Sequence, residues 1–295
     1  MSQIEEIGIQ PPKRGQVLVV QGPTASGKSG LALDLALKYN GVVINADAMQ
    51  VYQEIPIITA APSKEDKQKV EHRLYEIFPP EKNGSVTEWL DLAVGAVKDV
   101  LKHEMIPIVT GGTGFYIESL TKGISPIPET SDEIKKQVAQ IIKDKGVSGA
   151  WKYLQDIDEK AANMVKSNDS TRVRRALEIK LDTGVSIAEW FRQPLVQKLP
   201  QVEFVKVTLL PQLDELEKKC AKRFDLMIKN GAIDEVKSLL ARNIPDNMPA
   251  MKAIGVPELR DYLQGKVSLE DAIKLAVLHS RQYAKRQLTW FRNRG

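Results

Sequence analysis

The sequence holds a single cysteine, Cys220, in 295 residues. One cysteine excludes an intrachain disulfide and a cysteine-based zinc cluster, and it suits a reducing compartment. Because Cys220 lies in a stretch of helical pattern, we interpret it as a small core residue and not as a nucleophile. Hydrophobic runs long enough to span a bilayer are missing, and residues 1–16 lack the apolar stretch of a signal peptide. We therefore expect a cytoplasmic protein.

The excess of positive charge is small. The sequence has 42 Lys and Arg against 38 Asp and Glu, a net charge of +4 and an isoelectric point of about 8.9. This balance fits a nucleic acid or an anionic small molecule as partner, but many other enzymes share it, so charge alone leaves the partner open. The content of 42% hydrophobic and 27% charged residues is typical of a globular protein. The length allows one large domain or two modest ones.

Four short apolar runs predict buried β-strands, at residues 16–20, 42–46, 106–110 and 202–209. Helical spacing appears at residues 30–39 and again at residues 86–103. Strands that alternate with helices imply an α/β fold with a parallel sheet flanked by helices.

The character of the sequence changes after Gly123. Pro126 and Pro128 indicate a linker, and residues 131–191 are helical in pattern and nearly free of strands. We predict an all-helical insertion at residues 125–197. The α/β core would then consist of residues 1–124 and 198–295, with further helices toward the C-terminus.

A phosphate-binding pattern, Gly-x4-Gly-Lys-Ser, follows the first predicted strand and precedes a helix. Its glycines let the backbone wrap an anion, and the positive end of the helix adds attraction. Lys28 is placed to neutralise phosphates and Ser29 to hold a magnesium ion. This setting favours a P-loop NTPase-like core with a di- or triphosphate ligand over a chance glycine-rich turn. The predicted loop consists of Gly22, Pro23, Thr24, Ala25, Ser26, Gly27, Lys28 and Ser29.

Asp47 stands at the end of the second predicted strand. Ligands of open α/β sheets bind at the carboxyl ends of the strands, so we expect Asp47 to face the phosphate loop as a general base. The alternative is a helix N-cap. The third predicted strand ends without the magnesium-holding acid of a typical motor NTPase. It runs into a glycine-rich turn in which Thr113 can donate a hydrogen bond, unless that turn merely starts a helix.

Further motifs occur in a specific order and spacing. They are Asn-Ala-Asp at residues 45–47, Met-Gln-Val-Tyr at 49–52, Gly-Gly-Thr-Gly-Phe-Tyr at 111–116, Asn-Asp at 168–169 with Arg-Ala-Leu-Glu at 175–178, Ala-Ile-Gly at 253–255, and Tyr-Ala-Lys-Arg-Gln-Leu-Thr-Trp-Phe-Arg at 283–292. Together with the phosphate loop they resemble the tRNA dimethylallyltransferases of the bacterial type, which lack a zinc finger. The resemblance covers nearly the whole chain.

The resemblance implies transfer of a dimethylallyl group from dimethylallyl diphosphate to N6 of the adenosine at position 37, beside the anticodon of tRNA. Diphosphate leaves, so charge grows on the group that the loop, Lys28 and Mg²⁺ hold. Thr24 would bond a diphosphate oxygen, and Asp47 would accept the amine proton. The helical insertion would clamp the anticodon stem, and we expect a monomer. The implied tRNA-binding residues are Asp47, Ala48, Met49, Gln50, Thr113, Lys135, Thr171, Arg172, Arg174, Arg175, Arg281 and Lys285.

This chain departs from the family pattern at six positions. Ala48 replaces a serine, Ala61 a lysine, and Val256 with Pro257 a Tyr-Lys or Tyr-Arg pair. Lys135 and Lys219 replace arginines, which keeps the charge but loses the bidentate fork.

Two basic groups suit contact with a phosphate backbone. Arg172, Arg174 and Arg175 lie close together in the insertion, whereas Arg281, Lys285 and Arg292 share one face at helical spacing. Each group can equally be a solvated surface. The interleaved aromatic residues Tyr283, Trp290 and Phe291 could stack on bases, but helical position favours a core role.

Three other functions stay open. A small-molecule kinase shares the loop and the acid but has no need for a basic helical insertion. An isopentenyltransferase acting on free adenine nucleotide is closer in chemistry. A non-catalytic RNA-binding module would leave Asp47 and Lys28 without a purpose.

Overall fold

The computed structural model describes residue 4 and residues 7–294. By its internal contacts the chain forms two compact units, Met1–Thr121 with Lys198–Gly295, and Lys122–Gln197. Among the described residues no helix has both the length and the apolar character needed to cross a membrane. Each unit has its own hydrophobic core.

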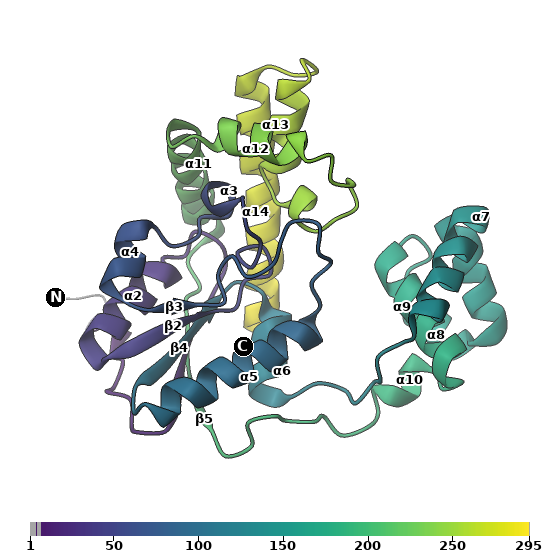
Figure 1. Ribbon diagram of the computed structural model, residues 1–295, viewed down its shortest axis with the longest axis horizontal. Coiled ribbons are helices and arrows are strands. Elements are labelled where there is room, and N and C mark those ends of the chain that lie inside the picture. The colour runs from purple at the N-terminus through teal and green to yellow at the C-terminus, as the bar shows by residue number, and fades with distance from the viewer. Residues whose placement is uncertain (1–3, 5–6, 295) are drawn as a thin grey trace. The chain divides into compact units, whose positions relative to one another are not determined.

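The first unit is built on a five-stranded parallel sheet in the order β3-β2-β4-β1-β5 (Figure 1). The predicted α/β fold is confirmed. The strands are β1 (Gln16–Gln21), β2 (Gly41–Asn45), β3 (His72–Arg73), β4 (Ile106–Gly111) and β5 (Glu203–Thr208). Four of them lie within one residue of the predicted runs. Every residue of β1 and β2 is buried, as expected for a parallel sheet covered on both faces.

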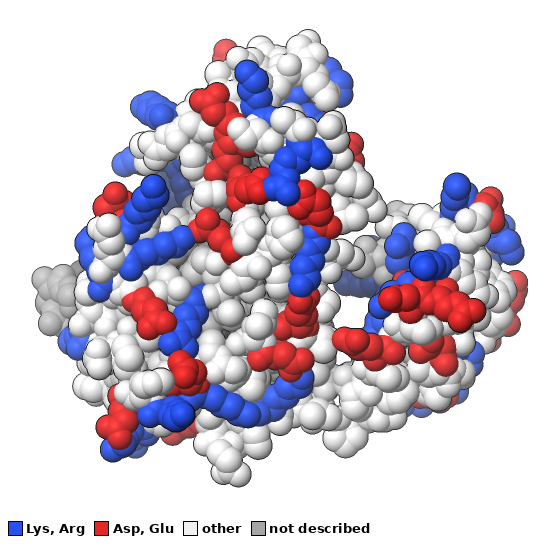
Figure 2. Space-filling model, in the orientation of Figure 1, with Lys and Arg blue, Asp and Glu red and all other residues white. Residues whose placement is uncertain are grey.

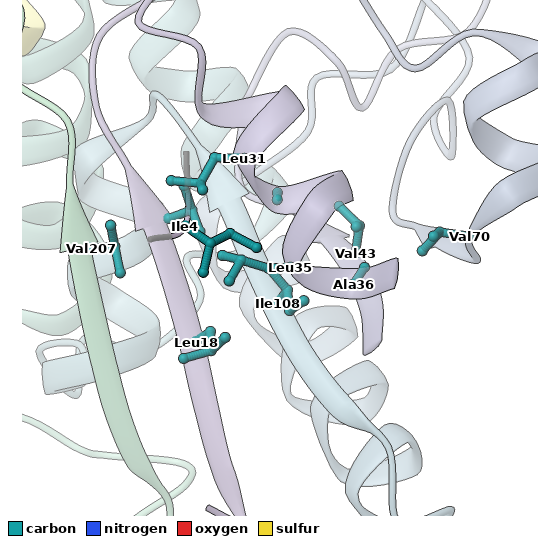
Figure 3. Packing of buried hydrophobic residues seen from close by; sticks show 11 residues of the cluster. Ile4, Leu18, Leu31, Leu35, Ala36, Val43, Val70, Ile108 and Val207 are labelled. Carbon is teal, nitrogen blue, oxygen red and sulfur yellow. The ribbon is translucent and has the colours of Figure 1, made fainter. Parts of the chain in front are cut away.

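Helix α2 (Lys28–Tyr39) packs on the centre of this sheet. Its Leu31 and Leu35 meet Leu18 of β1 and Ile108 of β4 in one buried cluster (Figure 3). Helix α5 (Val86–Lys102) packs along β2 and β4. Its fully buried Trp89 donates a hydrogen bond to the Asn45 carbonyl at 2.9 Å. These contacts fix the ends of β1, β2 and β4, from which the candidate site is built.

Short helices and a C-terminal helical group complete the first unit. The short helices are α3 (Pro56–Thr59), α4 (Lys64–Lys69) and α6 (Gly114–Lys122). After β5 come α11 (Leu213–Lys229), α12 (Ala232–Ala241), the 3₁₀ turn η1 (Ala250–Lys252), α13 (Val256–Leu263) and α14 (Leu269–Arg294). Helices α11 and α14 pack on each other. Cys220 is buried in α11, which confirms the core interpretation.

The second unit is helical. It contains α7 (Asp132–Ile157), α8 (Glu159–Ala162), α9 (Ser170–Thr183) and α10 (Ile187–Trp190). Helix α7 breaks at Gly146, whose φ of 66° and ψ of 173° are not helical. Leu154 of α7 packs with Val173 and Leu177 of α9 in the buried centre. The role predicted for this unit as an RNA clamp stays a prediction.

Candidate active site

The phosphate loop connects β1 to α2. Gly27, the N-cap of α2, has a φ of 92°, which favours glycine, and no side chain caps the helix start. The first turn of α2 also contains no acid. Its backbone N–H groups and the positive end of the helix dipole are therefore available to an anion. The buried Ser26 hydroxyl has no hydrogen-bond partner among the described residues, which fits a ligand oxygen as its partner.

Two cations flank this loop. Lys28 donates from Nζ to the Pro23 carbonyl at 3.2 Å. Burial lowers the pKa of Lys28 to about 8; the Asp47 carboxylate partly opposes this shift, and the charge of Arg223 adds to it. Arg223 of α11 donates from Nη2 to the Thr24 hydroxyl at 2.7 Å. Burial also lowers the pKa of Arg223, yet a guanidinium keeps its charge in proteins.

The sequence-based prediction of the site missed Arg223. The sequence contains a signal for it in the helical spacing. Arg223 follows Cys220 by three residues and precedes Met227 by four, which places it on the buried face of α11. A cation on the apolar face of an amphipathic helix needs a partner inside the protein. Here the partner is the phosphate loop.

Asp47 follows β2, in a turn that its own neighbours hold. Its backbone N–H donates to Asn45 Oδ1 at 2.8 Å, and its Oδ1 accepts from the Met49 N–H at 2.9 Å. No helix begins at this point, so the alternative of a helix N-cap is wrong. The Asp47 charge is close enough to influence the pKa values of Lys28 and Arg223. The structure therefore brings the acid and the phosphate loop together at one edge of the sheet.

The turn after β4 lies against the Asp47 turn. Thr113 accepts at Oγ1 from the Ala48 N–H at 2.9 Å, and its own N–H donates to the Ala46 carbonyl at 3.3 Å. Helix α6 starts directly after this turn, at Gly114. The turn therefore starts a helix, as the alternative interpretation has it, and it also fixes the backbone beside Asp47. Donation of a hydrogen bond by Thr113 to a ligand stays a prediction.

Tyr283 and Gln287 of α14 enter the site from the C-terminal helix. The Tyr283 side chain is half-buried, and burial together with the nearby Asp47 charge raises the pKa of its phenol. Gln287 is buried and contacts both the phosphate loop and Gly112. Phe291 is buried in the core, as the helical pattern favours.

A pocket of about 210 Å³ borders the start of α2. Ser29 lines it, together with Tyr75 and Thr110. Ala61 lines it as well, at the position where the family pattern has lysine, so the pocket lacks that cation. Gln50 lies nearby in the chain and donates from Nε2 to the carbonyls of Thr59 and Ala60, at 2.9 and 2.8 Å. Its amide thus supports the Ala61 segment.

The described residues contain no cluster of three or more His, Cys, Asp and Glu side chains. A divalent cation can still be held in such a site by one or two protein oxygens and by phosphate oxygens. Ser29 is exposed and lines the pocket, so its hydroxyl oxygen is one such candidate ligand.

In the helical unit, some of the predicted basic residues form ion pairs or hydrogen bonds within the protein, and others are exposed without a recorded ion pair in the part that the structure describes. Arg172 pairs with Asp169 at 3.5 Å and Lys135 with Asp132 at 3.0 Å. Arg175 donates to the Thr130 hydroxyl at 3.2 Å and lies 3.8 Å from buried Glu178. Arg174 and Thr171 are exposed on α9, and no ion pair is recorded for Arg174 among the described residues.

In the first unit, the predicted basic stripe of α14 is partly paired. Arg281 pairs with Glu217 of α11 at 2.6 Å. Lys285 and Arg292 are exposed, and in the described part of the chain neither has a recorded ion pair. Acidic and basic side chains are interspersed on the face that Figure 2 shows, so surface charge alone does not mark an RNA-binding face.

Comparison with known proteins assigns the family. A family model of IPP transferases matches residues 50–294. The chain belongs to this family. It is 40% identical over 282 residues to a tRNA dimethylallyltransferase of Rhodopseudomonas palustris (strain BisB18), which covers 96% of this chain and 89% of the relative. A protein of the same name from a Wolbachia of Brugia malayi is 42% identical, over 95% of this chain and 93% of the relative.

Solved structures of similar fold agree. A tRNA isopentenylpyrophosphate transferase of Bacillus halodurans has a TM-score of 0.64 at 34% identity, covering 95% of this chain and 88% of that one. A eukaryotic dimethylallyltransferase, described as acting on tRNA, has a TM-score of 0.80 at 28% identity, covering 93% of this IPP transferase and 69% of that chain. The sequence-based family assignment is confirmed.

Proposed function

We propose that this IPP transferase moves a dimethylallyl group from dimethylallyl diphosphate to N6 of the adenosine beside the anticodon of tRNA. The observation that carries the proposal is the convergence of Thr24, Lys28 and Arg223 with the Asp47 carboxylate. The side chains of Thr24, Lys28 and Arg223 suit a leaving diphosphate. The Asp47 carboxylate suits an amine that loses a proton. The names of the relatives support the same reaction.

The reaction forms one bond and breaks another. The N6 amine attacks C1 of the allylic donor, and the C1–O bond breaks with its electron pair going to the diphosphate. The proton leaves N6 for Asp47, whose Oδ2 lies 3.4 Å from the point where a side chain on Gly112 would begin. A general base acts at hydrogen-bond distance from the proton that it removes, so the proposal requires the N6 amine to bind beside the Asp47 carboxylate.

Charge builds up on the diphosphate as the C1–O bond breaks. Lys28, the Arg223 guanidinium and the free N–H groups of α2 stabilise that charge because they are fixed before the reaction. With a pKa of about 8, Lys28 is mostly protonated at neutral pH. Ser29 would help to hold a magnesium ion, which when bound would supply further positive charge beside the diphosphate.

The acceptor is proposed to be an anticodon loop because an unpaired base leaves its stack at lower cost than a paired one. Exposed Arg174 of the helical unit and exposed Lys285 of α14 are proposed to contact its backbone. Arg172, Arg175, Lys135 and Arg281 would contact it only by sharing or exchanging their present acidic partners.

The experiment is a matrix of two donors and two acceptors. The protein with Mg²⁺ is incubated with dimethylallyl diphosphate or ATP, and with an anticodon stem-loop or AMP, and all products are separated. We expect one modified acceptor, the dimethylallylated stem-loop, with diphosphate released alongside it. Efficient modification of AMP without the stem-loop would favour the free-nucleotide transferase, and phosphoryl transfer from ATP would favour a kinase.

A further inference from the structure

One buried amide connects the two halves of the candidate site. The Gln287 side chain, 5% exposed, accepts at Oε1 from the Thr24 N–H at 2.8 Å and donates from Nε2 to the Gly112 carbonyl at 2.7 Å. Thr24 lies in the phosphate loop after β1, and Gly112 lies in the turn after β4. The partners fix the orientation of the amide, because an N–H must face an acceptor and a carbonyl must face a donor.

Gly112 lies between this amide and the proposed base. A Cβ atom on Gly112 would lie 2.3 Å from Gln287 Nε2 and 3.4 Å from Asp47 Oδ2. The next residue, Thr113, accepts from the Ala48 N–H directly after Asp47. A shift of the Gly112 backbone would therefore move the turn that holds Asp47.

The carbonyl end of the Gln287 amide contacts the phosphate loop, which would hold the diphosphate of the allylic donor. Gln287 Oε1 accepts a hydrogen bond from the Thr24 N–H, while the Thr24 hydroxyl accepts one from Arg223. Thr24 is thus held by its backbone from α14 and by its side chain from α11. The amide fixes the separation between the loop that would hold the diphosphate and the turn that carries the base.

We infer that Gln287 is a positioning residue for group transfer, which keeps the donor loop and Asp47 at the spacing that the attack requires. This inference rests on the proposed function. Glutamine suits the task because it accepts at one end and donates at the other. Misplacement of reacting groups by about 1 Å can reduce a rate by about 10²-fold, so the rate of the chemical step is the sensitive readout.

The test compares Gln287→Met and Gln287→Glu with Gln282→Met, which makes the same change at an exposed position of α14. Single-turnover rates are measured at saturating stem-loop and dimethylallyl diphosphate, with stem-loop affinity and thermal unfolding measured in parallel. We expect Gln287→Met to lose about 10²-fold in rate, with stem-loop affinity within about twofold of wild type. Gln282→Met keeps the wild-type rate.

Gln287→Glu adds a signature that a purely structural role would not give. The introduced carboxylate can accept from Thr24 but cannot donate to Gly112 until it is protonated. Its rate relative to wild type should therefore rise as the pH falls. A wild-type rate in Gln287→Met, or a pH-independent ratio for Gln287→Glu, overturns the inference. Absence of transfer by the wild-type protein would instead contradict the proposed function.

Discussion

The pKa of Lys28 gives the candidate donor site a pH dependence that can be measured without RNA. Burial lowers this pKa to about 8 in the ligand-free protein. Below that pH Lys28 carries its charge, and above it the charge is lost. A bound diphosphate favours the charged form, so binding must take up a proton at high pH. Between pH 7 and pH 9 the affinity for a diphosphate should therefore fall about tenfold through Lys28 alone.

The assay is calorimetric titration with inorganic pyrophosphate and Mg²⁺ at constant ionic strength. Pyrophosphate itself titrates in this range, so Lys28→Met serves as the control that retains the titration of the ligand and loses that of the lysine. The ratio of wild-type to variant affinity should be large at pH 7 and about tenfold smaller at pH 9. An equal ratio at both pH values would refute the claim that Lys28 neutralises the diphosphate.

Three further changes separate the proposed roles. Asp47→Asn should lower the single-turnover rate by about 10²-fold or more and leave stem-loop affinity nearly unchanged; a near-normal rate would remove Asp47 from the role of base. Arg223→Met should weaken pyrophosphate binding at least tenfold, through loss of a charge-assisted contact of about 1.5–3 kcal/mol, and titration calorimetry measures it; unchanged affinity would leave Arg223 a structural partner of Thr24. Arg174→Ala and Lys285→Ala should each lower the slope of log affinity for the stem-loop against log salt by about one. Arg174 and Lys285 are both exposed, so unchanged slopes would indicate that they are solvated surface charges.

The sheet and its loop were predictable because the signals are local. The runs around Leu18, Val43 and Ile108 are apolar and bounded by turns, and parallel strands place their carboxyl ends at one edge. That rule alone brings Asp47 to the phosphate loop. β3 (His72–Arg73) escaped prediction, because a two-residue edge strand with polar side chains is defined by its pairing with β2 and not by its own sequence.

The rest of the candidate site depends on long-range packing. Arg223 and Gln287 stand on helices more than 190 residues after the phosphate loop, in sequence separations of 199 and 263 residues from Thr24. Helical periodicity tells which residues share a face, but not which loop that face meets. Gln287 carries no charge to mark it, and its role becomes visible only through its two backbone partners. The free or paired state of Arg174 and Arg281 likewise follows from neighbours on other turns or helices.

Transfer to the adenosine beside the anticodon is tested most directly by mass spectrometry of nucleosides. A stem-loop with that adenosine and a matched stem-loop with guanosine in its place are incubated with the protein, dimethylallyl diphosphate and Mg²⁺, then digested completely. We expect N6-dimethylallyladenosine from the first RNA and none from the second. Dimethylallylation of both RNAs, or of neither while AMP is modified, would contradict it.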